Sequence, residues 1–173
     1  MQDHWYLQQK IVELEDKNRR DNIRISGIKE KLEGKHMMAF PSTLLPELTS
    51  LQFQPPLEFQ RAHRIRTRRE VTPDHPRHII AWLLSHQHVQ QQILPAKKHG
   101  PYTYQDLRVT ITQDVLQQTM QTRKRFLSLR PDLRKLDIRY GLLDPATVLK
   151  THNNVMTEYI EPRWLEEWLG TLC

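Results

Sequence analysis

The chain contains one cysteine, Cys173, and it is the last residue. A disulfide within the chain is therefore impossible, a structural metal site built from cysteines is excluded, and a reducing compartment is expected. Glycine is also scarce, with 5 residues in 173, and the sequence holds no glycine-rich phosphate loop, Gly-x-Ser-x-Gly turn or His-Glu-x-x-His motif. His86 and His88 are two apart in an expected helix, so they point in different directions. We expect no catalytic residue, no metal and no cofactor.

Long apolar runs are missing as well. No run approaches the roughly 18 residues that a membrane-spanning helix needs. The first residues, Met-Gln-Asp-His-Trp, lack the basic and then apolar plan of a signal peptide. We therefore expect an intracellular protein with no membrane partner.

Positive charge is what the chain has in excess. Lysine and arginine number 26 against 20 acidic residues, which gives a net charge of +6, and the mean hydropathy is -0.70. A basic surface favours a polyanionic partner, because each neutralised phosphate releases condensed counterions. Charge alone leaves two alternatives open, a membrane surface and a basic protein that binds neither.

The first twenty residues have the spacing of a coiled-coil helix. Leu7, Ile11 and Leu14 recur at intervals of four and three, and Asn18 takes the next position of the seam. Such a seam predicts self-association. An ordinary helix that covers the next domain is the alternative, because fewer than three heptads are marginal in water.

Residues 21–111 predict one α+β domain. Strands are expected at 22–28, 57–65, 78–84 and 107–111, with helices at 42–51 and 85–98. This β-α-β-β-α-β order is that of the split β-α-β fold, in which antiparallel strands cover two helices and leave one sheet face free. The third domain, 112–173, is expected to be a smaller α+β domain.

That third domain should open with a helix capped by Thr112 or Asp114 and ended by Pro131. Its core positions are apolar residues at helical spacing, namely Leu116, Met120, Phe126 and Leu127. Strands at 138–143, 147–151 and 155–160 follow, and a helix from Pro162 closes the chain. Trp164, Leu165, Trp168, Leu169 and Leu172 should form the apolar face of that helix.

Five segments together resemble one family, the nucleic-acid-binding proteins from the first open reading frame of LINE-one-type retrotransposons. They are Arg19–Ile28, Phe59–Ile65, Pro76–Leu83, Thr122–Phe126 and Ile138–Ala146. The resemblance implies a trimerising coiled coil, an RNA-recognition-motif (RRM-like) domain and a carboxyl-terminal domain. It also implies single-stranded RNA as partner, with single-stranded DNA as a second candidate. The expected location is a cytoplasmic ribonucleoprotein particle, with the nucleus as a second location. Family members carry a much longer coil, so a fragment or a truncated copy is expected.

The resemblance places nucleic-acid contacts on basic and aromatic residues: Arg24, Arg61, His63, Arg64, Trp82, Arg123, Lys124, Arg139 and Tyr140. In an ordinary RNA-recognition motif, aromatic side chains of the central strands stack bases. Here Arg24 stands at such a position, and Trp82 should face outward, with burial in the core as the alternative. Each basic residue taken singly could equally be a solvated side chain. Asp144 departs from the family, which commonly has an aromatic residue there.

Two classes of function follow from these patterns. The first is a structural RNA-binding component that coats RNA and rearranges strands as a nucleic-acid chaperone. The pattern from Lys10 to Glu15 resembles one that favours trimers, so a trimer is expected for the full-length protein. The alternatives are an enzyme, a nuclease or esterase on a binding fold, and a non-mobile binding module retained by a host. No small-molecule substrate is expected.

Overall fold

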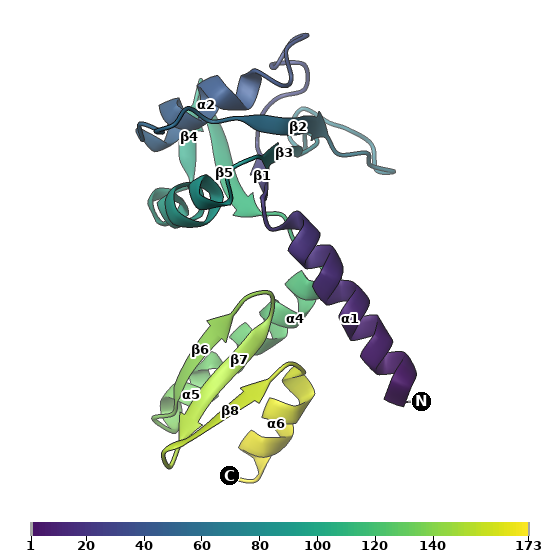
Figure 1. Ribbon diagram of the computed structural model, residues 1–173, viewed down its shortest axis with the longest axis vertical. Helices are drawn as coiled ribbons and strands as arrows, with labels where there is room; N and C mark the ends of the chain where they lie inside the picture. Colours follow the sequence, from purple (N-terminus) through teal and green to yellow (C-terminus); the bar gives the residue numbers. More distant parts are fainter. Residues whose placement is uncertain (1, 173) are drawn as a thin grey trace. The chain divides into compact units, whose positions relative to one another are not determined.

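The computed structural model describes residues 2–172, so Cys173 lies outside the described part (Figure 1). A helix, α1 (Gln2–Arg19), precedes a five-stranded sheet, and a three-stranded sheet follows it. The chain forms two compact units. We call residues 18–114 the central unit, and the residues up to Lys17 together with those from Val115 onward the terminal unit. The expected α+β class is confirmed.

The sheet of the central unit is antiparallel throughout. Its strands are β1 (Asn22–Ser26), β2 (Phe59–Arg64), β3 (Ile79–Leu83), β4 (Tyr102–Tyr104) and β5 (Leu107–Gln113). They lie in the order β2-β3-β1-β5-β4, which puts β1 between β3 and β5. The four expected strands are present. The additional strand β4 pairs with β5 across a tight turn in which both central residues have positive φ angles, Gln105 (46°) and Asp106 (63°).

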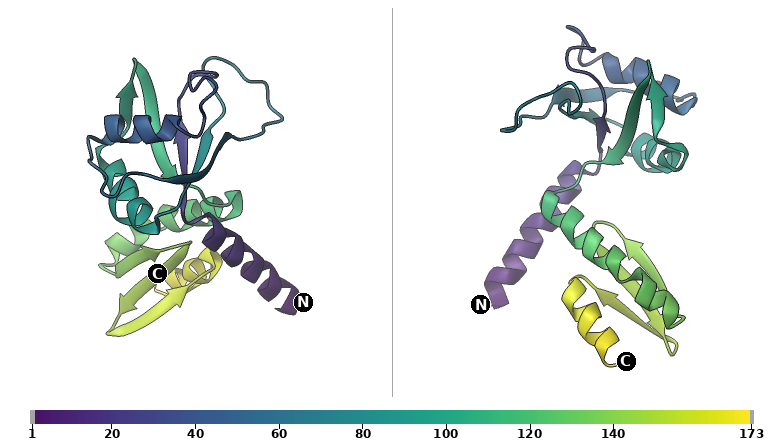
Figure 2. Two further views of the ribbon diagram at one scale, coloured as in Figure 1. Left: turned by 45° about the horizontal axis from the view of Figure 1, so that its top comes forward. Right: turned by 180° about the vertical axis from the view of Figure 1, so that it is seen from behind.

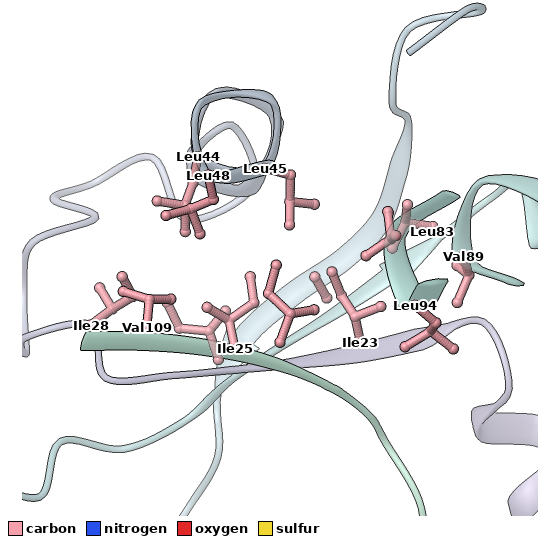
Figure 3. Close-up of a cluster of buried hydrophobic side chains, with 14 of the residues drawn as sticks. Ile23, Ile25, Ile28, Leu44, Leu45, Leu48, Leu83, Val89, Leu94 and Val109 are labelled. Carbon is pink, nitrogen blue, oxygen red and sulfur yellow. The ribbon is translucent and has the colours of Figure 1, made fainter. Parts of the chain in front are cut away.

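One face of this sheet carries the core of the central unit (Figure 3). Alternation along β1 points Ile23 and Ile25 to this face, and both are fully buried. Helix α2 (Phe40–Thr49) lays Leu44, Leu45 and Leu48 over them. The second helical segment adds its own apolar side chains to the same cluster. Both helical segments therefore cover one face, as the split β-α-β order predicts.

The second helical segment is less regular than the sequence predicts. Instead of one helix over 85–98, it consists of a π-helical turn (His88–Ile93), the short α3 (Leu94–Ala96) and a 3₁₀ turn (Lys97–His99). Pro95 lies in the first turn of α3. Proline has no N–H to donate to the preceding turn and its ring crowds that turn, so Pro95 interrupts the regular α-helical hydrogen bonding of this segment.

Besides most of α1, the terminal unit combines three helices with a three-stranded antiparallel sheet. The helices are α4 (Gln117–Ser128), α5 (Arg130–Lys135) and α6 (Pro162–Gly170), and the strands are β6 (Arg139–Leu143), β7 (Thr147–His152) and β8 (Val155–Tyr159), in the order β6-β7-β8. Helices α4 and α6 lie on the same face of the sheet (Figure 2, right). The hydrophobic core of this unit contains Phe126, Leu133, Ile138, Val148, Tyr159, Leu165 and Leu169.

The prediction for helix α4 was wrong in its cap and its buried face. The helix begins after Leu116, and neither Thr112 nor Asp114 caps it. Phe126 is buried, as predicted, but Met120 and Leu127 are 37% and 40% exposed, and Thr119 is buried instead. Asp16 of α1 is the reason. Its carboxylate accepts the Leu116 backbone N–H at 2.9 Å and the Thr119 hydroxyl, which turns the Thr119 side of α4 toward α1.

The two ends of the expected apolar face of α6 are also wrong. Leu165 and Leu169 are buried, but Trp164 and Leu172 are 38% and 39% exposed.

Pro131 does follow the end of α4, as predicted. It also lies in the first turn of α5, where a missing N–H costs nothing.

Candidate functional site

The expected coiled-coil seam is an exposed stripe on α1. Leu7, Ile11 and Leu14 are 59%, 56% and 58% exposed. Three large apolar side chains on one side of a helix would normally be covered by other parts of the protein. The rest of the described chain leaves this stripe uncovered.

The opposite side of α1 packs on the rest of the terminal unit. The rings of Trp5 and Trp164 have centroids 5.5 Å apart, and Gln9 donates a hydrogen bond to Glu161 at 3.4 Å. Asp16, buried, binds the start of α4. In heptad terms Leu7 and Leu14 are d positions, so Trp5 is a b position, and Gln9 and Asp16 are f positions, which lie outside a coiled-coil seam. The two expected roles of α1 thus use different sides of it.

The outer face of the central sheet combines cations with an aromatic ring. The pairing of β2 with β3 sets Arg61 opposite Trp82 and His63 opposite Ile80, all on the face away from the helices. The Arg61 guanidinium lies 4.9 Å from the centroid of the Trp82 ring. Trp82 is partly exposed and faces outward, as expected, and Arg61 and His63 are exposed. We call Arg24, Arg61, His63 and Trp82 the sheet-face cluster.

Arg24 joins this cluster from β1 and is held by an acid. Its Nη2 donates to Asp114 Oδ1 at 2.9 Å, and its side chain is 30% exposed. Asp114, buried, also accepts hydrogen bonds from Asn22 at 3.1 Å and Arg19 at 3.4 Å. The acid fixes the orientation of Arg24 and offsets part of its charge.

His78 lies beside Arg24, with 3.5 Å between its Nδ1 and Arg24 Nη1. Partial burial lowers the pKa of His78 below its usual value, and the charges of Arg24 and Arg69 lower it further. Arg69 belongs to the connection between β2 and β3, in which Arg66 and Arg68 are also exposed. The run of positive charge in this connection is visible in the sequence, but these arginines were not among the expected contact residues.

Arg64 was wrongly expected at the nucleic-acid surface. The alternation of side chains along β2 puts Arg64 on the core side of the sheet, opposite Ile79, and its side chain is 4% exposed. The guanidinium binds the Glu33 carboxylate at 2.6 and 2.9 Å and donates to three backbone carbonyl oxygens, those of Ile28, Lys29 and Arg77. This buried arginine ties the 29–35 connection to β2 and has a structural role.

In the terminal unit, helix α4 carries the expected basic pair. Lys124 is exposed. Arg123 has a side chain only 16% exposed; its Nη2 binds Asp144 at 2.6 Å and its Nε donates to the Pro145 carbonyl oxygen. Asp144, which stands where the family commonly has an aromatic residue, is therefore in direct contact with one of the expected nucleic-acid-binding residues.

Arg139 and Tyr140 point to opposite faces of the small sheet, because they are neighbours on β6. Arg139 is exposed on the face away from the helices. Tyr140 is partly buried on the helix side, where its hydroxyl accepts the Arg130 Nε–H at 3.0 Å; this hydrogen bond lowers the pKa of Tyr140. The structure does not bring these two residues into one contact surface.

The terminal unit also contains a buried lysine that the sequence did not predict. Lys150 of β7 is 4% exposed, and its Nζ lies 3.2 Å from the centroid of the Trp168 ring and 5.7 Å from that of Tyr159. Burial lowers the pKa of Lys150. The charge is stabilised by the aromatic rings around it. A lysine in an alternating strand gives no sequence signal that separates it from a surface residue.

Within residues 2–172, no cluster of three or more His, Cys, Asp or Glu side chains is arranged to hold a metal ion. His86 pairs with Asp21 instead, with 2.5 Å between Nδ1 and Oδ1.

None of the helices in the described residues has the length and apolar character needed to cross a membrane.

Comparison with known proteins relates the chain to a retrotransposon protein. No protein-family model matches the chain. The LINE-1 retrotransposable element ORF1 protein of Mus musculus is 25% identical over 169 residues, which cover 95% of this chain and 47% of the mouse protein. The chain thus spans about half the length of that relative. The resemblance expected from the sequence is confirmed, and the chain is distantly similar, over nearly its whole length, to a LINE-1 ORF1 protein.

Proposed function

We propose that the chain binds single-stranded nucleic acid, chiefly RNA, as a non-catalytic component of a LINE-type retrotransposon ribonucleoprotein particle. The sheet-face cluster carries this proposal. It places Arg61 over Trp82 at 4.9 Å on an open sheet face, with His63 and Arg24 beside them. An aromatic ring stacks an unpaired base and the guanidinium groups bind phosphates, which is the combination that single-stranded nucleic acids require.

The terminal unit supplies a second set of contacts in this proposal. Lys124 and Arg123 on α4 and Arg139 on β6 would bind phosphates, whereas Tyr140 and Arg64 are not assigned a contact. Two weak sites on one chain raise the effective concentration of each for the same strand. Self-association through Leu7, Ile11 and Leu14, as a trimer in the full-length protein, would multiply them again. Coating of RNA and chaperone activity, in cytoplasmic and nuclear particles, would follow from many such weak contacts.

The salt dependence of RNA binding tests this proposal. If roughly four to eight phosphates are contacted, the logarithm of the affinity should fall against the logarithm of salt concentration with a slope of about -3 to -6. The measurement is fluorescence anisotropy of a labelled single-stranded RNA. Replacement of Arg123 and Lys124 by Ala should reduce the slope by about 1 to 2, with circular dichroism unchanged. A flat salt response would refute the proposal.

Chelation separates this function from a metal-assisted nuclease. RNA binding to lysine and arginine side chains should survive EDTA, and the RNA should remain intact after long incubation with Mg²⁺. Cleavage that EDTA stops would favour the enzyme instead.

A further inference from the structure

An aromatic cleft in the terminal unit belongs to neither contact set. It has a volume of about 850 Å³ and is formed by the start of α1, the first turn of α6 and one side of α4. Three aromatic side chains line it, Trp5, Tyr6 and Trp164, together with the two cations Arg125 and Arg163. The cleft thus gathers three of the chain's 13 aromatic residues.

The aromatic rings are open to a ligand. Tyr6 is 56% exposed and Trp164 is 38% exposed. The planes of Trp5 and Trp164 are inclined at 53° with their centroids 5.5 Å apart, so the two rings are not stacked in parallel. A third planar ring could stack on the exposed part of the Trp164 indole or on the exposed Tyr6 ring. Stacking of a base on an aromatic side chain is sequence-tolerant, because every base has a π-face.

The two arginines of the cleft are exposed and could bind the phosphates that flank a base. Arg125 binds Glu166 at 3.1 Å and Arg163 binds Glu167 at 3.5 Å, yet their side chains are 54% and 70% exposed. Exposed ion pairs of this kind are weak, so a phosphate could replace the carboxylate.

The cleft also contains two acids, Asp3 and Glu161. They balance the two arginines, so the cleft does not attract an anion strongly by charge alone. Recognition should therefore depend on the ring of the ligand more than on its phosphate.

The cleft adjoins the basic side of α4, because Arg125 of this helix lines it. Successive helical residues are about 100° apart around the axis. Arg123 faces Asp144, Arg125 lines the aromatic cleft, and Lys124 is exposed between them. A strand that binds Lys124 therefore has only to cross α4 to bring a base to the cleft. Trp5 and Tyr6 are b and c positions of the heptad, so a coil formed through Leu7 and Leu14 leaves the cleft open.

We propose that Trp5, Tyr6 and Trp164, with Arg125 and Arg163, form a stacking site for an unpaired base of single-stranded nucleic acid. This inference rests on the proposed function and adds a base-dependent contact to the phosphate contacts of α4.

The test compares two ligands that have the same phosphates. One is a fluorescent thymidine dodecamer, and the other is a dodecamer of the same length and charge whose sugars are abasic. The wild-type chain should bind the thymidine dodecamer at least about fivefold more tightly. Trp164→Ala should lower that affinity by a similar factor and leave binding of the abasic dodecamer unchanged. Met156→Ala is the control, since Met156 is an exposed apolar residue of the same unit that does not line the cleft.

Tyr6→Ala is a second variant that tests the same site if the Trp164→Ala protein misfolds. Tyr6 is more than half exposed, so its removal should not affect folding, and it should reduce the preference for bases in the same direction. Equal losses for both dodecamers, or an unchanged preference in both variants, would overturn the site. So would displacement of the thymidine dodecamer by a decaproline peptide whose own binding needs Trp164.

The two proposals fail in different ways. If the wild-type chain binds neither dodecamer, nor single-stranded RNA, the proposed function fails and this inference fails with it. If the wild-type chain binds both dodecamers and the variants keep the wild-type preference, nucleic-acid binding stands and the stacking site is refuted.

Discussion

Asp16 of α1 holds the first turn of α4: its Oδ1 accepts the backbone N–H of Leu116 at 2.9 Å. A carboxylate at this place does the work of an N-cap, although it comes from a helix about a hundred residues earlier. The carboxylate also accepts the Thr119 hydroxyl, and Asp16 is 6% exposed. The connection makes α1 part of the terminal unit.

Asp16→Ala should therefore destabilise the terminal unit by about 1 to 3 kcal/mol, because two donors lose a buried acceptor. Urea unfolding followed by tryptophan fluorescence measures this, since Trp5, Trp164 and Trp168 belong to that unit. Glu15→Ala, at an exposed neighbouring position of α1, is the matched control and should change stability little. Equal stability of the two variants would show that the cap contributes nothing.

Arg61 and Arg64, three residues apart on β2, should respond oppositely to the same change. Arg64→Met leaves the buried Glu33 carboxylate without its partner and should destabilise the central unit by about 3 to 5 kcal/mol. Arg61→Met should leave stability nearly unchanged and weaken RNA binding. Thermal unfolding and fluorescence anisotropy on both variants check this. Loss of RNA affinity in a fully stable Arg64→Met protein would restore Arg64 to the contact surface.

Asp144 should weaken the terminal RNA contact through its bond to Arg123. Asp144→Asn removes the negative charge 2.6 Å from the Arg123 guanidinium. RNA affinity at low salt should rise roughly two- to fivefold, the range expected of one exposed charge pair. Asp137→Asn is the control, since it makes the same charge change at an exposed position of positive φ that Asn tolerates. An equal gain in both variants would mean that only net charge matters.

His78 should make the stability of the central unit depend on pH. Burial, Arg24 and Arg69 lower its pKa in the folded state below the usual 6.5. The unfolded chain then binds more protons than the folded one just below pH 6.5, so stability falls as the pH drops through this window. His78→Gln should flatten this fall in urea unfolding measured from pH 5 to pH 8. RNA phosphates near Arg24 should raise the pKa of His78, and a titration of its imidazole signals by NMR would detect this.

The periodic parts of the sequence predicted most of the fold. Ile23 and Ile25 gave β1, and Leu44, Leu45 and Leu48 gave α2, because burial on one face produces a repeat that the sequence displays. The turn between β7 and β8 lies at Asn153 and Asn154, which both adopt positive φ, a conformation that asparagine tolerates. The short strand β4 was missed because three residues carry too little periodicity.

Contacts between distant residues were not predictable in the same way. Nothing in the sequence near Asp16 indicates that it caps α4, about a hundred residues away. Because the cap comes from Asp16 and not from a residue just before α4, the helix has a different orientation from the predicted one, and Met120 is exposed. Arg64 and Lys150 looked like ordinary surface cations. Their burial depends on partners, Glu33 for the arginine and Trp168 for the lysine, that lie far away in the sequence and that no local pattern reveals.

The last prediction concerns the exposed stripe of Leu7, Ile11 and Leu14. Its 18-residue helix offers about 27 Å of seam, which is marginal for a stable coiled coil. The chain alone should therefore be mainly monomeric at low micromolar concentration in sedimentation experiments. Three trimer-forming heptads added before Gln2 should give a trimer with tighter RNA binding, and Ile11→Asp in the extended chain should abolish both gains. A stable trimer of the chain as it stands would refute the marginal seam, and a dimer of the extended chain would refute the trimer.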